Sequence, residues 1–147
     1  MQSGPLNASR PRIAARTIGR VLLGAMLVFA GVSHLTYARH DFLAQVPPWL
    51  PLNPDLVVVL SGVFEIVLGM ALLLLARQKF FLGWIAAAFF VCVFPGNIAQ
   101  YTHHRNAFHL DTDQARLIRL FFQPVLVAWA LWSTSAWRDY RQTRNKQ

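Results

Sequence analysis

Four apolar runs, each about twenty residues long, constrain the fold of this chain more than any other feature. They lie at residues 17–37, 55–76, 80–101 and 117–137. A helix of that length crosses the roughly 30 Å hydrocarbon core of a bilayer. Apolar residues make up 55% of the chain, and the connections between the runs are too short to form a second domain. The sequence therefore predicts an all-α integral membrane four-helix bundle over 17–137, flanked by basic tails at 1–16 and 138–147.

The basic residues indicate how this bundle is oriented. The chain carries 14 Lys and Arg against 6 Asp and Glu, which gives a net charge of +8. They gather before the first run, between the second and third, and after the fourth: Arg10, Arg12, Arg16 and Arg20; Arg77 and Lys79; Arg138, Arg141, Arg144 and Lys146. These three groups lie on one side of a four-span chain, and the positive-inside rule makes that side cytoplasmic. Both termini are therefore predicted to be cytoplasmic, with the basic tails near anionic membrane lipid and no nucleic-acid partner.

Glu65 is a lone carboxylate in the middle of the second apolar run. An ionisable group at that depth costs roughly 2.5–3.5 kcal/mol on insertion scales, so it needs a partner or a task. If Arg119 reaches it, the two residues form a buried structural ion pair. If not, Glu65 is a candidate to bind a ligand or carry a proton. The sequence leaves both alternatives open.

Other polar residues fall at related depths. At about 1.5 Å per residue, with both termini on the inner side, most of them lie in the outer half of the membrane and Glu65 lies near its middle. Ser61 and Glu65 are spaced i,i+4, as are Arg119 and Gln123, so each pair shares one helix face. We therefore expect a polar cluster that is a candidate ligand-binding or proton site: His34, Ser61, Glu65, Asn97, Arg119 and Gln123. No catalytic motif of any enzyme class is present, so no catalytic residue is predicted.

Prolines mark two further features. The connection 38–54 contains Val-Pro-Pro-Trp-Leu-Pro-Leu-Asn-Pro over 46–54, which cannot be helical. We expect either an apolar cap on the outer helix ends or a loop that its prolines merely stiffen. Pro95 predicts a kink in the third run. The amide of Asn97 is then expected either to repair the backbone locally or, preferably, to reach a neighbouring helix.

The histidines and the cysteine argue against several cofactors. Only His34 lies clearly within an apolar run, whereas haem in a bundle needs axial ligands on facing helices. The remaining histidines fall on the outer side, without the convergent spacing of a metal site: His40, His103, His104 and His109. Haem and metal are therefore disfavoured. The one cysteine, Cys92, excludes a disulfide within the chain and is expected to be a small packing residue.

Several motifs in order resemble the DoxX-like family of small four-helix bacterial membrane proteins. They are Gly-Val-Ser-His over 31–34, Val-Pro-Pro-Trp-Leu-Pro over 46–51, Ser-Gly-Val-Phe-Glu-Ile-Val-Leu-Gly over 61–69, Arg77, and Val-Phe-Pro-Gly-Asn-Ile over 93–98. The similarity covers about residues 17–135. Gly96 stands where an alanine is more usual, and Arg-Leu-Phe-Phe-Gln over 119–123 replaces Arg-Leu-Pro-Leu-Gln. The proline at 124 instead puts the shape of the fourth helix in question.

The resemblance implies a location and a setting rather than an activity. It implies the bacterial cytoplasmic membrane, and it carries over as site residues His34, Ser61, Glu65, Asn97 and Gln123. The family takes its name from a membrane subunit of a thiosulfate:quinone oxidoreductase, and a relative is linked to a membrane complex handling thiol and radical stress. Most members are uncharacterised.

Two functions remain as alternatives. The first is a non-catalytic membrane subunit or adaptor of a redox or stress-response complex. Its partner would be a protein of that complex or a second copy of this chain, and its cofactor would be a quinone. The second is a stand-alone small-molecule or proton-coupled carrier that uses Glu65. Small residues at Gly24 and Gly31, or at Gly62 and Gly69, would permit close helix contacts within or between chains.

Overall fold

The computed structural model describes residues 9–104 and 112–144, and within these ranges every regular element is helical. The predicted all-α fold is confirmed. In chain order the elements are α1 (Ser9–Leu35), α2 (Arg39–Leu43), α3 (Pro54–Leu74), the 3₁₀ turn η1 (Ala76–Gln78), α4 (Lys79–Thr102), α5 (Asp113–Ser133) and α6 (Ala136–Arg144).

Four helical segments are long enough and apolar enough to cross a membrane: Pro11–Leu35, Pro54–Leu74, Ala76–Thr102 and Asp113–Ser133. They correspond to the four predicted runs, with shifted ends. The first helix begins inside the predicted tail 1–16, and Trp137, predicted to close the fourth run, belongs to α6. Positive φ at Ser135 separates α5 from α6, so the chain turns there and the fourth span ends at Ser133.

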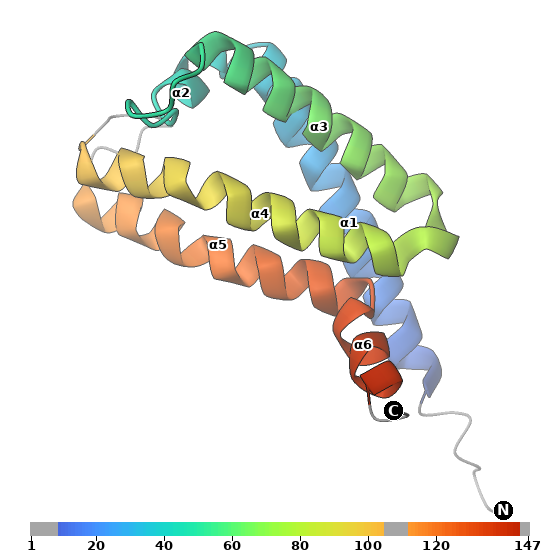
Figure 1. The fold of residues 1–147 in the computed structure, drawn as a ribbon. Helices are drawn as coiled ribbons and strands as arrows, with labels where there is room; N and C mark the ends of the chain where they lie inside the picture. Colours follow the sequence, from blue (N-terminus) through green and yellow to red (C-terminus); the bar gives the residue numbers. More distant parts are fainter. Residues whose placement is uncertain (1–8, 105–111, 145–147) are drawn as a thin grey trace, which may run out of the picture.

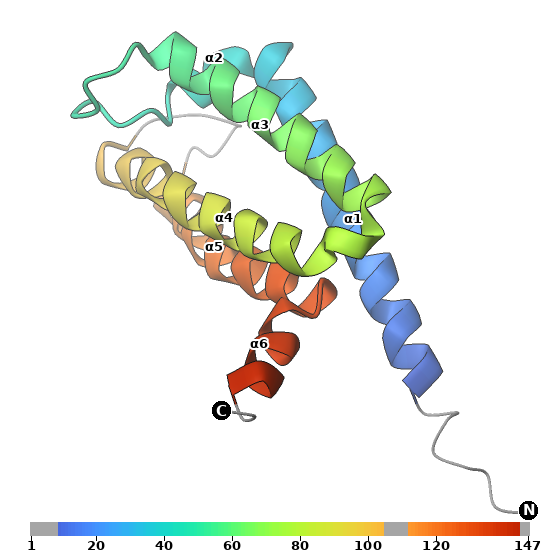
Figure 2. The same ribbon diagram turned by 45° about the vertical axis from the view of Figure 1, so that its right-hand side comes forward.

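The long helices form two antiparallel pairs. α1 packs mainly on α3, α4 packs mainly on α5, and α5 also contacts α1 (Figure 1). Both ribbon views show the pairs converging near the turn between α3 and α4 and diverging toward α2 (Figure 2). The core between the pairs is made of apolar side chains such as Leu23, Leu72, Ala86 and Phe90.

Paired glycines let α1 and α3 touch backbone to backbone. A Cβ on Gly69 would lie 2.6 Å from the carbonyl oxygen of Gly24, and a Cβ on Gly31 would collide with the carbonyl oxygen of Gly62. Side chains at these positions would therefore separate the helices. The predicted close contacts of small residues occur here within one chain.

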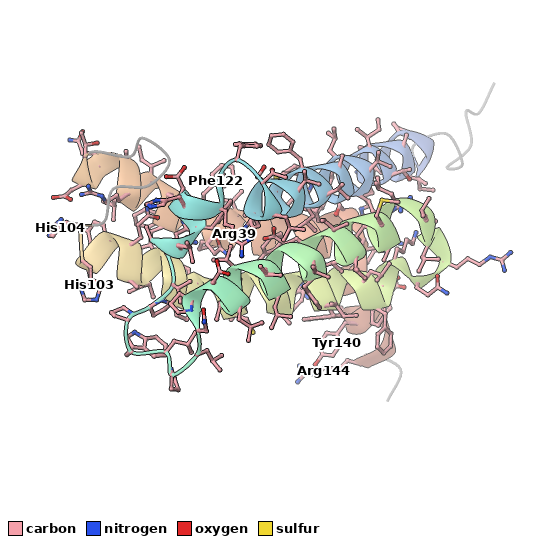
Figure 3. The ribbon with its side chains drawn as sticks, turned by 90° about the horizontal axis from the view of Figure 1, so that it is seen from above. Arg39, His103, His104, Phe122, Tyr140 and Arg144 are labelled. Atoms are coloured by element: carbon pink, nitrogen blue, oxygen red, sulfur yellow. The ribbon has the colours of Figure 1, made fainter. Side chains whose placement is uncertain are left out.

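The starts of α1 and α4, together with η1 and α6, lie at the end of the bundle opposite α2 (Figure 1), and these elements carry the described members of the three basic groups. Figure 3 shows His103 and His104 at one end and Tyr140 and Arg144 on α6, away from them. Arg20 is not a free tail charge, because it is buried and its guanidinium donates to the carbonyl oxygen of Leu72 near the end of α3. Lys146 and His109 lie outside the described residues.

Prolines were expected to exclude a helix from the connection after α2 and to kink α4. No helix forms over 46–53, as predicted, but Pro54, which was counted with this segment, is the first residue of α3, where its missing N–H is not needed. Asn53 caps α3 by accepting a hydrogen bond from the Asp55 amide. The short helix α2 before this segment was not foreseen. α4 continues as helix through Pro95. Its Gly96 faces the connection, since a Cβ there would lie 3.0 Å from the carbonyl oxygen of Gln45.

Candidate functional site

A cavity of about 440 Å³ opens between the two helix pairs, on the side of α2. Its walls come from α1, α2, α3, α4, α5 and the connection after α2. All six candidate residues named from the sequence line it: His34, Ser61, Glu65, Asn97, Arg119 and Gln123. The predicted cluster is thus brought together in space, while its role stays a prediction.

One polar wall joins α1 to α3 through His34. The imidazole Nε2 lies 3.4 Å from Oε2 of Glu65, and Nδ1 lies 3.1 Å from Oγ of Ser61. All three side chains project from facing positions of the glycine-lined crossing, where a Cβ on Gly62 would lie 2.7 Å from Cβ of His34. The close helix approach therefore fixes the position of the imidazole.

Hydrogen-bond accounting assigns the protons in this wall. The Ser61 hydroxyl donates to the carbonyl oxygen of Val58 at 3.0 Å, so it accepts from His34 Nδ1. A neutral imidazole protonated at Nδ1 keeps a lone pair on Nε2, which faces Glu65. Oε2 of Glu65 is buried and has no hydrogen-bond partner among the described residues. The 3.4 Å between these two atoms leaves room for a single proton but not for another heavy atom.

Arg119 is not the ion-pair partner of Glu65. The group beside the Glu65 carboxylate is instead the His34 imidazole, with Nε2 3.4 Å from Oε2. Arg119, half-buried on α5, lines the same cavity and interacts electrostatically with His34 and with Asp41 on α2. Of the two alternatives left by the sequence, the buried Glu65–Arg119 pair is wrong. The rotation of α5 decides this, and a single sequence does not specify that rotation.

The opposite polar wall joins α4 to α5. Asn97 Nδ2 donates to Oε1 of Gln123 at 2.9 Å, and Nε2 of Gln123 donates to the carbonyl oxygen of Phe90 at 2.6 Å. The interhelical role preferred for Asn97 is confirmed. The buried Gln123 side chain thus spans from the Asn97 amide to the α4 backbone.

The connection after α2 covers the outer side of the cavity. The Phe42 ring stacks on the His34 imidazole with centroids 3.4 Å apart, and Val46, Trp49 and Leu50 also line the cavity. Of the two expectations for this connection, the apolar cap is the one observed. Polar residues fasten it to α4, because Gln45 Nε2 donates to Oε1 of the buried Gln100 at 3.0 Å.

Phe42, Gln45 and Gln100 were not among the predicted site residues. Gln100 had a usable signal, since it is an amide four residues beyond Gly96 near the end of an apolar run. Phe42 and Gln45 had none, because their positions depend on the path of the loop. Cys92, expected to be a packing residue, is instead exposed on the protein surface, where it borders the cavity.

The cavity has the size and lining that are typical of small-molecule pockets. Its volume falls in the range of ligand pockets, roughly 300–1,000 Å³, and its walls are mostly apolar with a few convergent polar groups. Among the residues that the structure describes, no cluster of three His, Cys, Asp or Glu could hold a metal ion. The arrangement suits a ligand with an apolar body and a polar head.

Comparison with known proteins identifies a family but no named relative. No curated protein and no solved structure is similar enough to the chain to match. Residues 23–134 match the family described as Domain of unknown function (DUF8561). That segment contains the whole cavity wall and most of the four long helices. The chain therefore belongs to the family of the Domain of unknown function (DUF8561).

Proposed function

We propose that this protein is a non-catalytic membrane subunit or adaptor of a redox or stress-response complex, and that its cavity receives the head group of a quinone. A quinone joins a polar ring to a long apolar tail, which matches an apolar cavity with a few polar groups at membrane depth. The proposal concerns binding, and no electron-transfer step within this chain is implied.

The observation that carries the proposal is Oε2 of Glu65, a buried carboxylate oxygen on the cavity wall with no hydrogen-bond partner among the described residues. Leaving such an atom unpaired costs roughly 1–3 kcal/mol or more. A ligand hydroxyl, as in the reduced quinol, would donate to this oxygen. Arg119, on α5, lines the same cavity and carries donors for a ligand carbonyl.

The location that we propose is the bacterial cytoplasmic membrane, with both termini in the cytoplasm. Four segments of spanning length support a multi-pass arrangement. The basic residues at the end that holds both termini support the orientation through the positive-inside rule. The resemblance to DoxX-like proteins supports the bacterial membrane and a redox-complex setting.

Quinone-site binding can be tested with purified protein in detergent, using the reduced form decylubiquinol as the probe, since its hydroxyls can donate to Glu65, and quenching of tryptophan fluorescence as the readout. Trp49 lines the cavity and serves as the reporter. We expect saturable quenching, weakened about tenfold or more in Glu65→Gln, because a hydrogen bond to a charged group is lost.

Two alanines on α1 provide a matched pair of variants. Ala30 lines the cavity, whereas Ala25 is exposed and does not. Ala30→Phe should abolish saturable quenching, and Ala25→Phe should leave it intact. Equal quenching in wild type, Ala30→Phe and Glu65→Gln would refute the quinone site.

A second candidate, a proton-coupled carrier, is favoured by the same carboxylate. Glu65 and His34 face each other with room for one proton. This function predicts a proton flux in liposomes that contain the purified protein alone, with the flux lost in Glu65→Gln. Flux from wild type without any partner would favour the carrier over the subunit.

A further inference from the structure

A second cavity lies on another face of α5, and the proposed quinone site does not use it. Its volume is about 640 Å³, and it runs along α5 from Gln123 to Trp132, between α4 and α6. Gln123 is the residue that it shares with the first cavity. We call this second cavity the α5 groove.

The length of the α5 groove corresponds to one leaflet. Trp132 lies nine positions after Gln123, which gives roughly 14 Å along the helix at 1.5 Å per residue. One leaflet, which is half of a hydrocarbon core about 30 Å thick, has a similar thickness. Between its ends the walls are apolar and include Val127, Ala128 and Leu131. An acyl chain of a lipid in the leaflet on the side of the chain ends fits this shape.

The end of the groove nearest the chain ends is positively charged. Arg16 of α1 and Arg138 of α6 both line it. Ser135, in the turn before α6, accepts a hydrogen bond from Arg16 NH1 at 3.1 Å, which orients that guanidinium. The carboxylate nearby is Asp139, 3.5 Å from Nε of the exposed Arg138. Two arginines against one carboxylate leave this end cationic.

Helix α6 closes the groove and has the composition of an interfacial helix. Trp137 and Tyr140 pack toward Trp84 of α4, with ring centroids 6.5 and 5.9 Å from it. The guanidinium of Arg141 lies 5.1 Å from the Trp137 ring. Aromatic rings together with arginines whose charged ends reach toward water are typical of a helix lying in the headgroup region. The groove therefore ends at headgroup depth.

We infer that the α5 groove is a binding site for an anionic phospholipid, with an acyl chain along α5 and the phosphate between Arg16 and Arg138. The charge of the groove end selects an anionic over a zwitterionic headgroup. Basic residues in pockets between membrane helices bind such headgroups, each contributing about fivefold to binding.

The test is native mass spectrometry of the purified full chain, given equimolar phosphatidylglycerol and phosphatidylcholine. We expect wild type to retain phosphatidylglycerol preferentially. The preference should fall by about tenfold or more in Arg16→Gln/Arg138→Gln, since two headgroup contacts are lost. The charge-matched control Arg77→Gln/Lys79→Gln, whose residues are exposed near η1 and do not line the groove, should keep it.

A second pair of variants fills the groove without changing charge. Ala128 is exposed and lines the groove, whereas Val125 on the same helix is 54% exposed and does not. Ala128→Trp should lose the bound lipid, and Val125→Trp should retain it. An equal preference in wild type and in Arg16→Gln/Arg138→Gln, or retention in Ala128→Trp, would overturn the site.

Discussion

The glycine crossing of α1 and α3 offers a perturbation whose cost follows from the structure. In Gly69→Ala the new Cβ would lie 2.6 Å from the carbonyl oxygen of Gly24 and 2.9 Å from the amide nitrogen of Val28. Both neighbours are backbone atoms, so a side-chain rotation cannot relieve the contact. Ordinary contact begins at 3.4 Å, so the helices must separate by about 0.8 Å.

A separation of that size has a calculable effect. A radial gap of 0.5–1 Å forfeits about a quarter to a half of the dispersion energy of the contacts involved. Overpacking of a well-packed interface typically costs about 1–3 kcal/mol. We therefore expect Gly69→Ala to lower the free energy of unfolding by about 1–3 kcal/mol. Gly31→Ala should cost less free energy of unfolding in the Gly69→Ala background than it does alone, because the same helix separation relieves both contacts.

The assay is reversible unfolding in mixed micelles, titrated with SDS and followed by circular dichroism. Gly96→Ala is the control, because its Cβ would meet only loop atoms of Gln45, the nearest at 3.0 Å. It should cost about 1 kcal/mol or less. An unchanged midpoint in Gly69→Ala, or a cost equal to that of Gly96→Ala, would refute the close crossing.

Three further predictions concern other parts of the fold. Asn97→Leu should lower the free energy of unfolding by about 1 kcal/mol in the same SDS titration, because the bond to Gln123 is lost, and no change would argue against that bond. Arg39 forms an exposed two-point ion pair with Asp55, which raises the pKa of the guanidinium. A raised pKa contributes stability that is lost only as the pH rises through that pKa. Arg39→Gln should therefore lower the free energy of unfolding by the same small amount throughout neutral pH, and by less in high salt. A loss of stability that changes with pH in this range would contradict the ion pair. Cys92, deep in α4, should resist a charged maleimide in intact membranes and react after SDS denaturation; labelling in intact membranes would contradict insertion.

Much of the fold and the composition of the site could be predicted, because a single sequence gives the length of each apolar run and the depth of each polar residue within it. The four apolar runs became α1, α3, α4 and α5. Depth counting placed His34 and Gln123 in the same half of the bundle, and the structure has both lining one cavity. Helical spacing contributed the pairing of Ser61 with Glu65 on one face. These inferences need only the rise of a helix and the thickness of a bilayer.

The partners of these residues could not be predicted, since partner choice depends on how each helix is rotated. Glu65 pairs with His34 rather than Arg119 because the glycine crossing brings α1 against α3 at that depth. The Gln45–Gln100 bond depends on the path of a loop whose prolines exclude a helix without specifying a route.

Helix α6 was missed for a different reason. Residues 138–147 were interpreted by their charge as a tail, although Ala136, Trp137 and Tyr140 have the three- and four-residue spacing that gives a helix one apolar face. Reading that spacing would have predicted the helix.

The decisive measurement is native mass spectrometry of a tagged copy extracted gently from its own membrane, with Glu65→Gln measured in parallel. We predict a stoichiometric adduct with the mass of a quinone, alone or together with a partner protein, and loss of the quinone adduct in Glu65→Gln. A bare monomer or homodimer, identical for wild type and variant, would contradict the proposed ligand site and the subunit role together.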